Sequence, residues 1–306
     1  MKPITKQSDK KTAFTIIELL TVMSIIVILI GLLLPSLTMV KRYSKEVKQK
    51  AQFHSIESAL EFFSSEGEYG RYPDSNGLDE NADHYCGAMR LCEAMVGQDL
   101  AGFHPLSHWR ADCTDGASTQ LYANYPAGTA LGPDDTTNLK ARKQPYLPPD
   151  GANAYRLRDL YATFGAFNAN AADLFVLCDV YNRVRNRATG KGVGMPILYY
   201  KANVGNTKHD PTGASPPTAS DSAGYIYNYW DNEDLVNLKL PWDPTTSHPL
   251  ADPKKFYDTI TNKKITLTTA TPATTGWPYR QDSYILISAG FDGIYGTDDD
   301  IFDFEK

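Results

Sequence analysis

The stretch KKTAFTIIELLTVMSIIVILIGLLLPSL, residues 10–37, carries a single acidic residue, Glu18, within an otherwise apolar run. From Leu19 to Val40 the sequence has 22 residues without a charge. A helix of that length spans about 33 Å at about 1.5 Å per residue, and the hydrocarbon core of a bilayer is about 30 Å thick. The sequence therefore predicts a transmembrane helix, in which a lone carboxylate is costly unless it meets a partner.

The residues on either side of this run predict its orientation. Residues 1–13 hold four lysines and one acidic residue, and basic flanks stay on the cytoplasmic side of a membrane. The run ends without the small-residue cleavage site of a secretory signal peptide, so we expect the helix to be retained. Everything after about residue 40 is then exported.

The composition of the whole 306-residue chain indicates the class of protein that it forms. Hydrophobic residues make up 42% and charged residues 22%, which is typical of a globular chain. The 19 tyrosines and 19 prolines favour a body rich in strands and loops. The formal charge is −6 and no basic patch is present, so we expect no nucleic-acid partner.

Residues 13–18, AFTIIE, resemble the processing site of type IV pilins and of the pseudopilins of type II secretion. In that family a membrane peptidase cleaves before a phenylalanine, here between Ala13 and Phe14, and the new amino group is methylated. Glu18 matches the family's glutamate five residues into the mature chain, and Pro35 matches its helix-kinking proline. Ala13 stands where the family usually has glycine. The resemblance covers residues 1 to about 65.

This resemblance implies a cleaved leader (1–13), a long helix (14–66) that is transmembrane over about 14–40, and an exported globular domain (67–306). It implies a bacterial inner-membrane protein that assembles as a homo-oligomeric filament. The implied partners are the prepilin peptidase, an inner-membrane secretion platform and minor pseudopilins. In such a filament Glu18 would neutralise the α-amine of Phe14 on a neighbouring subunit.

Two apolar stripes follow the membrane segment at helical spacing. The first stripe is Val40, Tyr43 and Val47, and the second is Phe53, Ile56, Leu60 and Phe63. At about 100° per residue the step between the stripes rotates the apolar face by about 120°, so one face cannot serve both. We expect the first stripe to face other subunits and the second to pack on the globular body. A simple amphipathic stalk fits the spacing almost as well. Gly67 and Gly70 should end the helix.

The exported body reads as α+β, with an antiparallel sheet laid against the second half of the long helix. The predicted strands are 173–180, 196–202, 224–230 and 283–288, and shorter helices fit 153–164 and 250–262. Residues 68–78, EYGRYPDSNGL, resemble the segment that follows the long helix in major pseudopilins. Residues 79–170 are longer than a compact pseudopilin needs and are interpreted as an insertion.

Four cysteines occur in the chain, which permits two disulfides in an oxidising compartment. The most local candidate pair is Cys86 with Cys92. A zinc site is the alternative, because three histidines lie among the first three cysteines. Zinc is less favoured, since no C-x₂-C pair is present. The residues concerned are His84, Cys86, Cys92, His104, His108 and Cys113.

The C-terminal stretch SAGFDGIYGTDDDI, residues 288–301, is acidic and glycine-rich. Such turns can bring oxygen ligands together around a hard cation such as Ca²⁺, although a solvated acidic turn explains the spacing as well. An EF-hand is excluded by the spacing. The stretch resembles the calcium loop of major pseudopilins, with Phe291 where that family commonly has proline. The resemblance implies Asp298 and Asp300 as ligands, together with Asp292, Asp299 and a carbonyl of Ser288.

These observations favour a structural pseudopilin subunit of a periplasmic filament that drives export by a type II secretion system. The alternative from the same family is a type IV pilin or minor pilin in an adhesion, motility or DNA-uptake filament. An anchored enzyme is a third hypothesis. The sequence contains no G-x-S-x-G, H-E-x-x-H or P-loop motif, so we expect no catalytic residues.

Overall fold

The computed structural model describes residues 15–66, 70–117, 119–122, 135–148, 151–211, 224–266 and 275–305. The chain forms two compact units, Met1–Lys45 and Glu46–Lys306. One helix, α1 (Ile16–Glu66), contributes residues to both units. Each unit is therefore described by itself.

In the first unit, the described residues belong almost entirely to α1, and their large apolar side chains are exposed. Ile16 is 85% exposed, Leu32 71% and Met39 72%. The helix is long and apolar enough to cross a membrane, and its most apolar window buries nothing inside the structure. This is compatible with a single-pass membrane segment.

In the second unit, the remaining turns of α1 pack into a hydrophobic core. Phe53, Ile56, Leu60 and Phe63 are all buried, and Leu60 is fully covered. They form one cluster with side chains of a sheet, including Tyr199 and Leu286. The second apolar stripe therefore packs on the globular body as predicted, and α1 ends at Glu66, just before Gly67.

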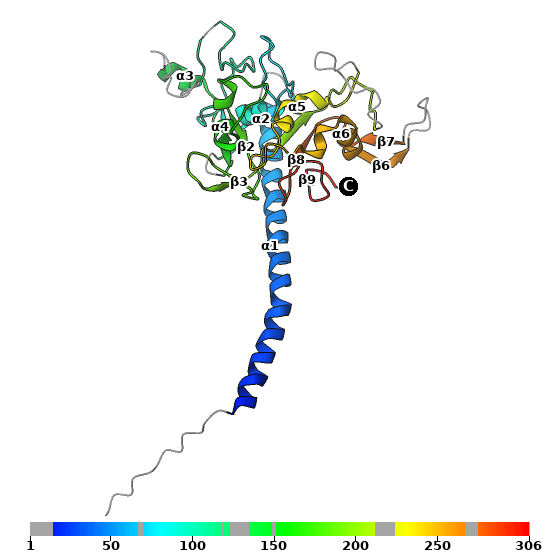
Figure 1. Cartoon of the computed structure of the whole chain (residues 1–306). Coiled ribbons are helices and arrows are strands. Elements are labelled where there is room, and N and C mark those ends of the chain that lie inside the picture. The colour runs from blue at the N-terminus through cyan, green and yellow to red at the C-terminus, as the bar shows by residue number, and fades with distance from the viewer. Residues whose placement is uncertain are drawn as a thin grey trace, which may run out of the picture. The chain divides into compact units, whose positions relative to one another are not determined.

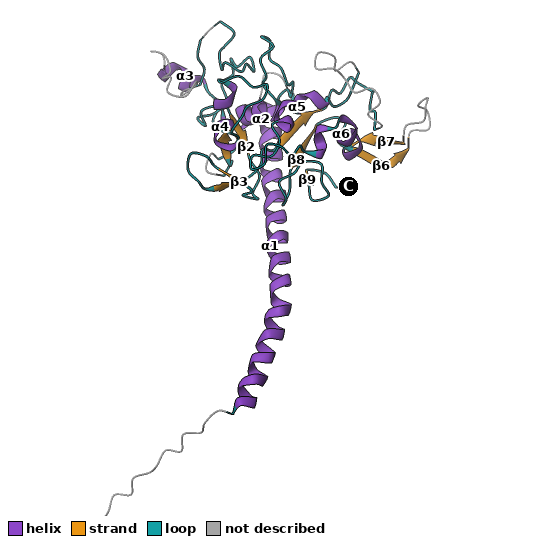
Figure 2. Cartoon of the chain, viewed as in Figure 1, coloured by secondary structure: helices purple, strands orange, loops and turns teal. Residues whose placement is uncertain are grey.

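The largest sheet has three antiparallel strands in the order β5-β8-β9, of which β8 and β9 are labelled in Figures 1 and 2. β5 (Leu198–Lys201) pairs with β8 (Tyr284–Ser288), and Leu198 lies opposite Ile287. β8 pairs in turn with β9 (Ile301–Phe302), and Ser288 lies opposite Ile301. All five residues of β8 are buried, as expected for a central strand with both faces covered.

Three two-stranded antiparallel sheets surround this one in the described part of the second unit. They are β1 (Ala154–Arg156) with β2 (Phe175–Leu177), β3 (Val184–Arg185) with β4 (Gly192–Val193), and β6 (Thr261–Thr266) with β7 (Thr275–Pro278). The described chain therefore combines a long N-terminal helix with small antiparallel sheets, an α+β arrangement.

Helix α2 (Gly87–Val96) lies in the core, and all ten of its residues are buried. It packs against β2 and β5. Its charged side chains are satisfied internally: the Arg90 guanidinium donates to the carbonyls of Tyr85 and Leu78, at 3.1 and 2.9 Å. Glu93 accepts hydrogen bonds from the hydroxyls of Ser107 and Tyr122, and burial raises the pKa of Glu93. The segment interpreted as an insertion thus contributes a central helix.

The remaining helices are short. The α-helices are α3 (Asp135–Ala141), α4 (Leu157–Leu160), α5 (Glu233–Asn237) and α6 (Pro253–Thr259). The 3₁₀ turns are η1 (Ala171–Asp173), η2 (Tyr229–Asp231) and η3 (Pro249–Ala251).

Two of the predicted elements differ from the structure. Residues 224–230, predicted as a strand, form an isolated bridge at Tyr225 and then enter η2, because the Asn228 side chain accepts a hydrogen bond from Trp230 N–H and starts a turn. Residues 153–164, predicted as a helix, contain β1 and only four helical residues, since Arg156 has extended backbone angles. The predicted strands at 173–180, 196–202 and 283–288 contain β2, β5 and β8.

Candidate functional site

The start of α1 is the first candidate site, and Glu18 there bonds to Thr15. The Thr15 amide donates to Glu18 Oε2 at 2.9 Å, and the Thr15 hydroxyl donates to the same oxygen at 2.7 Å. In return the Glu18 amide lies 3.3 Å from Thr15 Oγ1. These reciprocal contacts are a capping box, which satisfies backbone donors that the first helical turn leaves open.

This geometry gives Glu18 a partner within its own chain. Both residues are exposed. The predicted cleavage point, Ala13 and Phe14, lies outside the described residues. Pro35 lies within α1, which is continuous through it. Glu18 can therefore serve as a helix cap or as a partner for a positive charge. Capping requires only an acceptor oxygen, whereas charge pairing requires the ionised carboxylate.

The C-terminal acidic loop, residues 289–300, is the second candidate site and is closed by its own hydrogen bonds. Asp299 Oδ2 accepts from the Asp292 amide at 2.9 Å, and Asp292 Oδ1 accepts from the Ile294 amide at 2.7 Å. Asp300 Oδ2 accepts from the Gly296 amide at 2.7 Å. Gly290 has a φ of 64°, and an added Cβ there would collide with the carbonyl of Asp299, so the turn requires glycine.

Two carboxylates of this loop, those of Asp292 and Asp299, lie side by side. Burial, with the neighbouring charge of Asp299, raises the pKa of Asp292. Two adjacent carboxylates of this kind favour a proton or a cation between them. Asp298 is exposed, and the Ser288 hydroxyl donates to Asp179 at 2.9 Å. Among the residues that the structure describes, no three histidine, cysteine or acidic side chains are grouped so as to hold a metal ion. The expected ligand set is therefore only partly assembled.

Two residues that sequence analysis missed support the loop. Asp179 is buried, and its Oδ1 accepts from the amides of Tyr181 and Met195, at 3.1 and 3.2 Å, while Oδ2 accepts from Ser288. His248 accepts at Nδ1 from the Tyr295 amide at 3.1 Å, and burial lowers the pKa of His248 to about 4. A carboxylate two residues after the end of β2 was the available signal for Asp179, whereas His248 had none.

The cysteine predictions are not supported by the structure. All four cysteines are buried free thiols. Cys86 precedes α2 and Cys92 lies six positions along the chain, about 9 Å away at helical rise. A disulfide needs its Cα atoms within about 7 Å, so Cys86 and Cys92 do not pair in this fold.

The alternative zinc group is also not formed. His84 Nδ1 lies 2.6 Å from Asp234 Oδ2, and His104 Nδ1 accepts from the Leu106 amide at 3.1 Å. These two histidines are thus engaged with other partners. Residues 84–113, all described, contain no grouping of three metal-ligating side chains.

Comparison of the chain with models of known protein families, with curated proteins and with solved structures finds no match.

Proposed function

We propose that this protein is a pseudopilin, a structural subunit that is processed between Ala13 and Phe14 and assembled into a periplasmic filament of a type II secretion system. The observation that carries the proposal is a lone glutamate in the first turn of a long helix whose other side chains there are apolar and exposed. Exposed apolar surface over many turns needs lipid or other helices to cover it. In a membrane, lipid would cover this surface, and in a filament, the helices of other subunits would cover it.

On assembly, Glu18 would move from the bilayer surface into a filament of packed helices. Thr15 offers hydrogen bonds, and these leave the carboxylate with its full negative charge. A buried charge without a counter-charge costs several kcal/mol. Cleavage before Phe14 would create an α-amine four residues from Glu18 in sequence. Pairing that amine with Glu18 of a neighbouring subunit would neutralise both charges and fix the register of the two helices.

Calcium binding by the acidic loop is part of the proposal. The adjacency of Asp292 and Asp299 supports it, because a divalent cation would relieve the repulsion that burial intensifies. Asp298, Asp300 and the Ser288 carbonyl complete the proposed ligand set. Calcium bound there would supply charge neutralisation; the chain's own residues, Asp179 and His248, hold the ends of the loop in place.

Intact-mass analysis of the protein extracted from membranes of a host with a working prepilin peptidase tests the assignment. The expected mature chain begins at a methylated Phe14. A chain that keeps residues 1–13 in the same host would overturn it. Loss of exoprotein secretion on deletion of the gene supports the pseudopilin function, whereas intact secretion with loss of long extracellular filaments would instead indicate a type IV pilin.

A further inference from the structure

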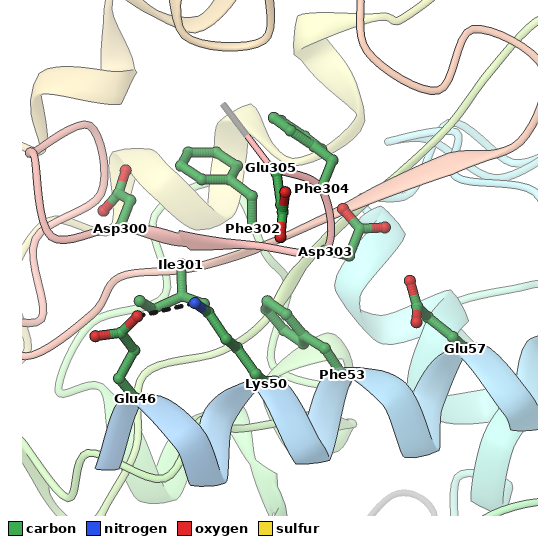
Figure 3. A pocket seen from close by; sticks show the side chains of 10 residues that line it. All are labelled: Glu46, Lys50, Phe53, Glu57, Asp300, Ile301, Phe302, Asp303, Phe304 and Glu305. Atoms are coloured by element: carbon green, nitrogen blue, oxygen red, sulfur yellow. Dashed lines mark ion pairs between the residues drawn. The ribbon is translucent and has the colours of Figure 1, made fainter. Parts of the chain in front are cut away.

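A groove in the second unit runs between α1 and the C-terminal residues (Figure 3). It has a volume of about 510 Å³. Four residues of α1 form one wall and residues 300–305, which include β9, form the other. We call this the acidic groove. Its α1 wall is Glu46, Lys50, Phe53 and Glu57.

The acidic groove has an apolar interior. Figure 3 shows Ile301 pointing from β9 toward α1, and Phe53 pointing from α1 toward β9. Phe53 is 2% exposed, so it forms a floor rather than a protrusion. β9 is also an edge strand of its sheet, bonded to β8 alone among the described strands. An apolar floor beside an edge strand favours an apolar side chain from a partner.

The walls of the acidic groove are strongly negative. Its lining contains five acidic residues and one basic residue, Lys50. Lys50 pairs with Glu46 at 2.9 Å, and the nearby Arg280 pairs with Glu57 at 2.6 Å and with Asp303 at 3.2 Å. The Asp303 side chain is fully buried, so the other four acids against these two bases leave the groove with a net negative field. Such a field attracts a basic partner and rejects an acidic one.

The complementary chemistry occurs on the chain itself, at residues 40–45. Val40 is 63% exposed and Tyr43 is 67% exposed, and they are three positions apart on α1. Lys41, Arg42 and Lys45 lie between and beside them. A helix segment with two exposed apolar side chains flanked by three basic ones matches an apolar floor with acidic walls.

We propose that the acidic groove binds residues 40–45 of a second copy of this chain. The inference rests on the proposed function, because it places this contact between neighbouring subunits of the filament. The groove and the basic segment are different parts of the chain, so the contact between two copies is heterologous. Heterologous contacts that do not close into a ring propagate as open helical filaments. The groove would thus add a second, extramembrane determinant of subunit register to the pairing at Glu18.

Cysteine cross-linking in the full-length membrane protein tests the contact. One copy carries Lys41→Cys and a differently tagged copy carries Glu305→Cys, a described and exposed residue of the groove lining. Mild oxidation should give a mixed dimer only when both variants are present. The four native thiols are buried, so background is low. The matched control replaces Glu305→Cys by Thr189→Cys, on the exposed β3–β4 turn, and should give no mixed dimer.

A charge exchange adds a second readout. Glu305→Lys alone and Lys41→Glu alone should each lower filament yield about two- to fivefold, as the loss of an exposed ion pair does. The double variant should recover the yield.

Failure of the inference is distinguishable from failure of the proposed function. Filaments that form normally while the 41–305 pair gives no more cross-link than the control would overturn the groove contact and leave the pseudopilin function standing. A chain that is neither processed at Phe14 nor assembled would overturn both.

Discussion

The two parts of α1 differ in what covers them, although they belong to one helix. Residues 16–45 expose Ile, Leu, Val and Met side chains. The part from Glu46 onward instead buries four apolar side chains in the hydrophobic core of the second unit, namely Phe53, Ile56, Leu60 and Phe63. The sequence changes character around this boundary, since the uninterrupted apolar run ends at Val40 and the buried stripe at helical spacing begins at Phe53. One helix therefore serves two environments, and the first of them must be supplied by lipid or by other molecules.

The largest expected effect comes from the buried part. Leu60→Ala should destabilise the second unit, Glu46–Lys306, by about 2–5 kcal/mol, because a fully covered leucine leaves a cavity when truncated. Val47→Ala is the matched control on the same helix; Val47 is 49% exposed, and its truncation should cost about 0.5 kcal/mol or less. Denaturant unfolding measures both. Equal losses at the two positions would contradict the burial of the second stripe, to which Leu60 belongs and Val47 does not.

A smaller effect concerns pH and the contact between α1 and the C-terminal residues. The Asp303 side chain is fully buried beside Arg280, and burial raises its pKa from 3.8 to about 7. The protonated form is thus favoured in the folded state. The stability that this contributes is complete below about pH 4 and is lost as the pH rises through about 7.

In wild type, the raised pKa of Asp303 should make the free energy of unfolding fall by about 1–4 kcal/mol between pH 4 and 7, at about 1.36 kcal/mol per pKa unit. Asp303→Asn should remove this fall. Unfolding at several pH values, with the exposed Asp282→Asn as control, measures the slope. If wild type and Asp303→Asn keep parallel profiles between pH 4 and 7, Asp303 is not the titrating group.

The smallest expected effect is that of calcium on the same unit. Calcium at about a hundredfold above its dissociation constant should add about 2.7 kcal/mol or less, because it binds the folded loop and not the unfolded chain. Asp299→Asn should abolish the gain and Asp282→Asn should keep it. Thermal unfolding with and without calcium measures this stabilisation. An unchanged unfolding midpoint at millimolar calcium would show that calcium does not bind and stabilise the loop.

Sequence patterns predicted the elements whose periodicity is strong. The length of α1, the buried second stripe and the strands β2, β5 and β8 follow from apolar spacing and β-branched content. Helix α2 was not predicted. Its Arg90 and Glu93 lie three positions apart and share one face, yet all ten residues of the helix are buried, and these two side chains bond to residues that are distant along the chain.

The candidate sites were predicted less completely for a related reason. Glu18 is conspicuous in sequence because its neighbours are apolar, but its bonds to Thr15 depend on where the helix starts. The acidic loop is conspicuous by composition, yet its supports, Asp179 and His248, come from segments about 40 residues or more away along the chain. Only the fold brings them to the loop.

The most direct test of the central claim separates the charge of Glu18 from its capping role. Glutamine serves in a capping box as glutamate does, so Glu18→Gln keeps the bonds to Thr15 and removes the charge, whereas Glu18→Ala removes both. The measurement is filament yield from equal amounts of processed protein, with Thr15→Ala to weaken the cap alone. Charge pairing predicts that Glu18→Gln fails to assemble as Glu18→Ala does, while Thr15→Ala still assembles. Normal filaments from Glu18→Gln, with loss only in Glu18→Ala and Thr15→Ala, would contradict the account.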